Sequence, residues 1–155
     1  MLETIKRSAP ARIINVASEM HAKSLIIEKL INDVNYKPMK VYGASKLAVI
    51  MLTFALARKL SGTAVTVNAV HPGVIYTHQS ARMAPTFFRP LLKLFMSSPE
   101  KGALPSLKLA MDSSLDGVTG QYYYKETKKQ TGPFSMDIEY QEKLYEKSLI
   151  WGGLK

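Results

Sequence analysis

Two short β-branched segments flank a long apolar helical pattern, and this order constrains the fold more than any other feature of the chain. Residues 12–18 (RIINVAS) show little polar alternation, as expected of a parallel strand that is covered on both faces. Residues 40–60 carry a strong helical pattern, and residues 64–70 form a second predicted strand that ends at the turn 71–73. Strand, helix and strand in this order predict parallel strands joined by a right-handed crossover.

Further segments extend this unit on its C-terminal side. They are a predicted helix at residues 99–111, a third strand at 120–125 and a terminal amphipathic helix at 139–149. No internal repeat or linker is visible, so we expect residues 1–155 to belong to one α/β domain with a Rossmann-like parallel sheet.

Composition and charge exclude several classes of function. The chain lacks cysteine, which excludes disulfides, zinc–thiolate sites and thiol nucleophiles. Its net charge of +9 keeps open the alternative of an electrostatic binder of nucleic acid or of an anionic membrane. The basic residues are spread along the chain and no nucleic-acid motif occurs, so no nucleic-acid partner is expected.

The apolar run at residues 47–57 is interrupted by a threonine and is shorter than the roughly 20 residues that span a membrane. We therefore expect a soluble, cytoplasmic protein. The alternative of a membrane anchor that precedes this sequence stays open.

Three segments predict a polar site at one edge of the sheet. Tyr42 and Lys46 lie four residues apart and so share one face of the predicted helix. A nearby cation favours the phenolate form of a tyrosine, which makes its hydroxyl usable as a general acid or base. Ser18 and the turn after residue 70 both follow the carboxyl ends of parallel strands, where sites in open α/β sheets form.

Several ordered motifs resemble the short-chain dehydrogenase/reductase family, in particular its retinol-dehydrogenase-like branch. The resemblance extends over nearly the whole chain, from residue 1 to about residue 149. The matching motifs are SAP at residues 8–10, RIINVAS at 12–18, YGASKLA at 42–48, VHPG at 70–73, SPEKGA at 98–103 and TGQY at 119–122.

The resemblance implies a role for each matching residue. Tyr42 would exchange a proton with the substrate oxygen, Ser18 would hold that oxygen, and Lys46 would support the tyrosine and bind the nicotinamide ribose. The turn at Pro72, Gly73 and Val74 would receive the nicotinamide end of the cofactor. Thr77 would bind its carboxamide or phosphate.

The implied reaction is hydride transfer between NADP or NAD and a small-molecule alcohol or carbonyl compound. The apolar segment at residues 74–98 is expected to form a lid over an apolar substrate, with a surface helix that covers the core as the alternative. Helices like the one at residues 40–60 form dimer faces in similar proteins, so a homodimer is possible.

The chain departs from the family pattern at one important point. It contains no G-x-x-x-G-x-G segment to cradle a pyrophosphate, and it lacks the family's Asn-Asn-Ala-Gly segment. We therefore expect the C-terminal portion of a Rossmann-like domain, a truncated three-layer α/β/α arrangement that lacks the N-terminal nucleotide-binding strands. Strand 12–18 would then present an unpaired edge. The alternative is a non-catalytic remnant, and isothermal titration of the 155-residue chain with NADP or NAD should show weak binding or none.

The remaining conspicuous side chains are expected to have structural roles. His71 should pack or bond locally, and His21 and His78 lack partner spacing for a metal, so no metal site is expected. The three tyrosines at residues 122–124 should lie in a strand, and the lysines at residues 125–129 should belong to a solvated loop.

Overall fold

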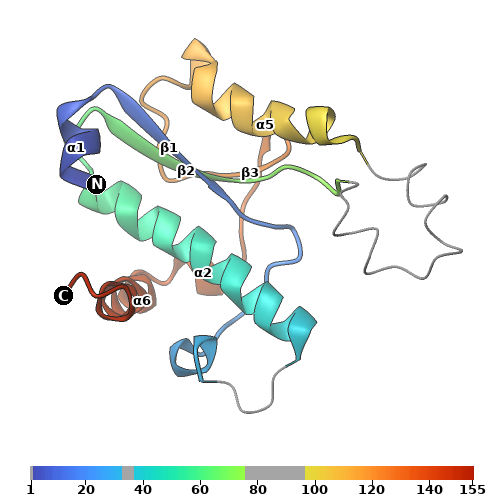
Figure 1. The fold of residues 1–155 in the computed structure, drawn as a ribbon, viewed down its shortest axis with the longest axis vertical. Helices are drawn as coiled ribbons and strands as arrows, with labels where there is room; N and C mark the ends of the chain where they lie inside the picture. Colours follow the sequence, from blue (N-terminus) through green and yellow to red (C-terminus); the bar gives the residue numbers. More distant parts are fainter. Residues whose placement is uncertain (1, 33–36, 76–96) are drawn as a thin grey trace, which may run out of the picture.

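A computed structural model describes residues 2–32, 37–75 and 97–155. Its centre is a sheet (Figure 1) that has four strands. The strand order is β1-β2-β3-β4. The strands are β1 (Ala11–Val16), β2 (Val65–His71), β3 (Tyr122–Tyr124) and β4 (Thr127–Lys128). The first three run parallel, whereas β4 is antiparallel to β3.

Helices cover both faces of the sheet and give three layers, as predicted. Helix α2 (Pro38–Lys59) lies on one face and α5 (Pro99–Met111) on the other, and α6 (Ile138–Trp151) packs against α2 outside the sheet (Figure 1). Successive side chains of a strand point to opposite faces. Accordingly Ile13 packs in the cluster beneath α2, while Ile14 packs against Leu109 of α5.

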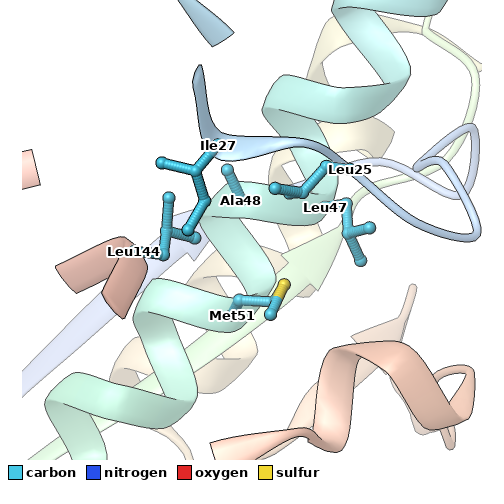
Figure 2. Close-up of a cluster of buried hydrophobic side chains, with 6 residues drawn as sticks. All are labelled: Leu25, Ile27, Leu47, Ala48, Met51 and Leu144. Carbon is cyan, nitrogen blue, oxygen red and sulfur yellow. The ribbon is translucent and has the colours of Figure 1, made fainter. Parts of the chain in front are cut away.

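Helix α2 forms the centre of the core. Its buried side chains contact the sheet on one side and α6 on the other, and Ile50 and Met51 are fully buried. Figure 2 shows the cluster in which Leu47 and Met51 of α2 meet Leu144 of α6. By length and composition alone α2 is also apolar enough to cross a membrane. A core helix has the same high hydropathy, and α2 packs between the sheet and α6 as a core helix does.

Short elements and polar contacts complete the arrangement. Helix α1 (Leu2–Arg7) precedes β1, and the 3-10 turns are η1 (Ile27–Leu30), η3 (Ser113–Leu115) and η4 (Pro133–Met136). Arg58 near the end of α2 contacts Gln141 and Glu142 of α6. Arg12 of β1 contacts the Leu109 carbonyl within α5 and Asp116 beyond the end of that helix. Arg58 therefore joins α2 to α6, and Arg12 joins the sheet to α5.

The predicted order of strands and helices is confirmed, but the C-terminal part of the sheet differs from the prediction. The third strand is limited to residues 122–124, and the segment predicted as a solvated lysine loop folds back as β4. Lys125 adopts a positive φ of 53° in the connecting turn and allows this reversal without glycine. The predicted lid falls mainly on residues 76–96, outside the described residues.

Candidate active site

Tyr42 and Lys46 lie in the first turns of α2 and face the carboxyl end of β1. Pro38 starts the helix at a position where its missing N–H costs no hydrogen bond. Lys46 Nζ donates a hydrogen bond to the Val16 carbonyl oxygen at 3.1 Å and lies 5.7 Å from the centre of the Tyr42 ring. Lys46 therefore joins the predicted tyrosine to the end of the predicted serine strand.

Ser18 lies in the loop directly after β1, and its side chain is only 4% exposed. Its Oγ accepts a hydrogen bond from the Met20 backbone N–H at 3.1 Å. His21 Nδ1 lies 2.9 Å from the Ser18 carbonyl oxygen and fixes the same turn. A hydroxyl can accept and donate at the same time, and no acceptor for the Ser18 hydroxyl proton is found among residues 2–32, 37–75 and 97–155, so this proton can be donated to the oxygen of a ligand.

The Ser18 loop packs directly on the helix beside Tyr42. The Ala22 N–H donates a hydrogen bond to the Gly43 carbonyl at 2.9 Å. A Cβ at Gly43 would lie 3.1 Å from the Met20 carbonyl oxygen and 3.3 Å from the Ala22 nitrogen. Glycine between Tyr42 and Ala44 thus permits a close approach that brings the serine loop and the tyrosine helix together.

The turn after β2 reaches the same edge of the sheet. Val16 is in register with Val70, and the Ala17 N–H donates to the Val70 carbonyl at 2.8 Å. Gly73 has a φ of +100°, a conformation that favours glycine, and Val74 is 62% exposed. The predicted serine, tyrosine–lysine and proline–glycine segments therefore converge at one end of the molecule.

A cluster around Glu19 was not predicted from the sequence. The Glu19 carboxylate forms an ion pair with Lys129 at 2.6 Å and accepts a hydrogen bond from the Tyr122 hydroxyl at 3.4 Å. Burial opposes ionisation of Glu19, but its contacts with Lys129 outweigh it and lower the pKa of the carboxyl below 4.5. Burial and the Glu19 carboxylate raise the pKa of Tyr122. This cluster ties the residue after Ser18 to the β3–β4 hairpin.

His71 ends β2 beneath this cluster and packs locally, as predicted. It is 6% exposed, and its ring centre lies 5.3 Å from that of Tyr124. Burial lowers the pKa of His71 below 6.5; the Glu19 charge opposes this shift and the Lys125 charge adds to it. The neutral imidazole is thus the form that the folded state favours.

The shift at His71 predicts a loss of stability in mild acid. Because the folded pKa is lowered, the unfolded chain binds more protons as the pH falls through 6.5, and folding is progressively disfavoured. Thermal unfolding between about pH 7 and pH 5 should show a falling Tm that is less steep in His71→Gln. Parallel slopes for wild type and His71→Gln would contradict this assignment.

Two predicted residues lie outside the described parts of the chain. They are Thr77, the expected cofactor contact, and His78. Within residues 2–32, 37–75 and 97–155, no group of three or more histidine or acidic side chains is arranged to hold a metal ion.

Sequence comparisons agree with the motifs that converge at this site. The family model described as short chain dehydrogenase matches residues 1–86. Retinol dehydrogenase 14 of Mus musculus is 36% identical over 99% of this chain and 48% of its own length. Retinol dehydrogenase 13 of Homo sapiens is 35% identical, over 100% of this chain and 50% of its own length. The chain spans about half the length of the curated relatives it matches.

Solved structures share the fold at lower sequence identity. L-Sorbose reductase from Gluconobacter frateurii, solved with NADPH and L-sorbose, superposes with a TM-score of 0.60 at 19% identity, over 86% of this chain and 51% of that one. An uncharacterized protein from Mycobacterium paratuberculosis gives a TM-score of 0.64 at 21% identity, over 90% of this chain and 49% of that one. These likenesses establish the α/β fold.

Proposed function

The chain belongs to the short-chain dehydrogenase family, and from this premise we propose that it supplies the proton-transfer half of an oxidoreductase site. The reaction is hydride transfer between a nicotinamide dinucleotide and an alcohol or carbonyl compound. The observation that carries this proposal is the position of Lys46, whose Nζ lies 3.1 Å from the Val16 carbonyl and 5.7 Å from the Tyr42 ring centre. It links the tyrosine to the end of β1, the strand that precedes the Ser18 loop.

Each of the three side chains has a distinct role in this proposal. The Tyr42 hydroxyl gives a proton to the substrate oxygen during reduction and takes one during oxidation. Ser18 Oγ–H donates a hydrogen bond to the same oxygen and stabilises its developing charge. Lys46 places its ammonium group 5.7 Å from the centre of the Tyr42 ring and would bind the nicotinamide ribose.

The nicotinamide cofactor, NADP or NAD, supplies or accepts the hydride when it is bound. The residues that would hold its nicotinamide half are Lys46, Pro72, Gly73, Val74 and Thr77. The positive φ of Gly73, which favours glycine at this turn, and the 62% exposure of Val74 support this assignment. The proposed homodimer and the cytoplasmic location remain predictions.

The substrate class follows from two relatives with apolar alcohols in their names. They are retinol dehydrogenase 14 and the polyprenol dehydrogenase of Homo sapiens, the latter 32% identical over 99% of this chain. We therefore propose an apolar primary alcohol or aldehyde as substrate. The test is absorbance of the reduced nicotinamide in the full protein that carries this chain, with retinol plus NADP or NAD, and with retinal plus the reduced cofactors. If the absorbance does not change with retinol or with retinal, the proposed substrate class is wrong. If it also does not change with a panel of smaller aldehydes and the reduced cofactors, the proposed function is wrong.

Ser18→Ala tests the proposed substrate hydrogen bond in the same assay. A hydrogen bond to a charged group is worth about 1.5–3 kcal/mol, so kcat/KM should fall roughly 10- to 100-fold. Ser114→Ala, which truncates an exposed serine after α5, should leave the rate unchanged. Equal rates for Ser18→Ala and wild type would remove Ser18 from its assigned role.

A further inference from the structure

A hollow lies on the side of α2 that faces away from Tyr42. It has a volume of about 370 Å³ and lies between the segment after β1 and the first turns of α2. Lys40 and Ala44 of α2 line it and share one helix face because they are four residues apart. Tyr42 is two residues from each, about 200° around the helix, so this hollow is separate from the candidate active site.

The floor of the hollow is apolar and continuous with the core. Leu25 lines it and belongs to the buried cluster with Leu47, and Leu30 and Ala44 pack against the same cluster. Figure 2 shows Leu25 beside Leu47, where the segment after β1 crosses α2. Ile26 also lines the hollow and is 52% exposed, which leaves apolar surface available to a ligand.

The rim of the hollow is positively charged. Lys23, Lys29 and Lys40 line it, and none of the three forms an ion pair with any residue in the described part of the chain. Glu28, the nearest acid in sequence to Lys29, is paired with Lys143 of α6. No acidic or aromatic side chain lines the hollow, so it offers cations and aliphatic surface but no stacking partner for a nucleotide base.

We propose that this hollow binds a free long-chain carboxylate, with its hydrocarbon tail on Leu25, Ile26 and Leu30 and its carboxylate among the three lysines. Aliphatic surface takes up the tail by the hydrophobic effect, and ammonium groups form charge-assisted hydrogen bonds with the head. The volume lies at the lower end of the range for small-molecule sites, which suits a single acyl chain.

The test is isothermal titration of the full protein with monomeric dodecanoate, with dodecanol as an uncharged ligand of the same length. Dodecanoate should bind saturably and more tightly than dodecanol. The double variant Lys29→Gln/Lys40→Gln should weaken dodecanoate binding roughly tenfold, about 1.4 kcal/mol, and leave dodecanol binding unchanged. Lys101→Gln/Lys128→Gln removes the same charge from exposed positions outside the hollow and should bind dodecanoate like wild type.

Ala44→Leu provides an independent variant, because it fills the floor of the hollow and should weaken both ligands. Equal affinity for dodecanoate and dodecanol would overturn the charged rim as a recognition element. Absence of saturable dodecanoate binding would overturn the proposal. Binding to phosphatidylglycerol vesicles that depends on Lys29 and Lys40 would also overturn the proposal, because the lysines would then bind a membrane surface. All of these readouts are binding measurements, so they do not depend on turnover at Tyr42.

Discussion

Tyr42→Phe should reduce turnover by about 100- to 10,000-fold in the hydride-transfer assay, the range that positioned acid–base groups contribute. The substitution removes the only proton that the Tyr42 side chain can exchange and keeps the aromatic ring near Lys46. Tyr42 is 39% exposed, so the substitution alters a side chain outside the buried core. The fall should therefore appear in kcat, with little change in Tm.

Tyr145→Phe is the matched control for this experiment. Tyr145 lies on α6, and Lys59 Nζ is 4.6 Å from its ring centre. Tyr145 therefore has a lysine beside its ring, as Tyr42 has, but it does not lie at the edge of the sheet where the candidate site is. Its variant should keep wild-type kcat. A Tyr42→Phe protein with wild-type turnover would remove Tyr42 from its assigned role, whereas a large drop in both variants would indicate a general loss of structure.

Leu47→Ala should lower the free energy of unfolding by about 2–5 kcal/mol, the cost of a large-to-small change in a packed core. Leu47 is 2% exposed and packs with Leu25, Ile27, Met51 and Leu144, so three separate segments lose contacts with its side chain (Figure 2). Urea denaturation of the full protein, followed by circular dichroism, measures the change.

Leu107→Ala removes the same atoms from an exposed position. It therefore distinguishes the loss of core packing from the effect of the leucine-to-alanine change itself. Leu107 lies on α5 and is 50% exposed, so its truncation should change the free energy of unfolding by about 0.5 kcal/mol or less. A loss for Leu47→Ala no larger than that of Leu107→Ala would show that α2 does not form the centre of the core.

The layered fold was predictable because its local patterns agree with one another. The strand at residues 11–16, the long helix and the strand at residues 65–71 each follow from β-branched runs and helical spacing. The short β4 was not predictable in this way. Thr127 and Lys128 are both exposed, so this strand carries no apolar alternation, and its turn depends on the positive φ of Lys125.

In the candidate site, too, some features were predictable from the sequence and others were not. The spacing of Tyr42 and Lys46 and the strand-end position of Ser18 are properties of the sequence, because helix and strand geometry fix where such side chains emerge. The ion pair between Glu19 and Lys129 joins residues that are 110 positions apart. A surface ion pair of this kind carries no local pattern that precedes folding.

The order of the elements, the family and the three side chains expected to carry the chemistry follow from the amino-acid sequence alone. These depend on backbone periodicity and motif spacing, which act over a few residues. Two further features depend on how the chain packs in three dimensions. They are the contacts that hold the Ser18 loop, at Gly43 and at Glu19, and the lysine-rimmed hollow beside the first turns of α2. Those features arise where distant segments pack together, and packing depends on the shapes of all the contacting surfaces at once.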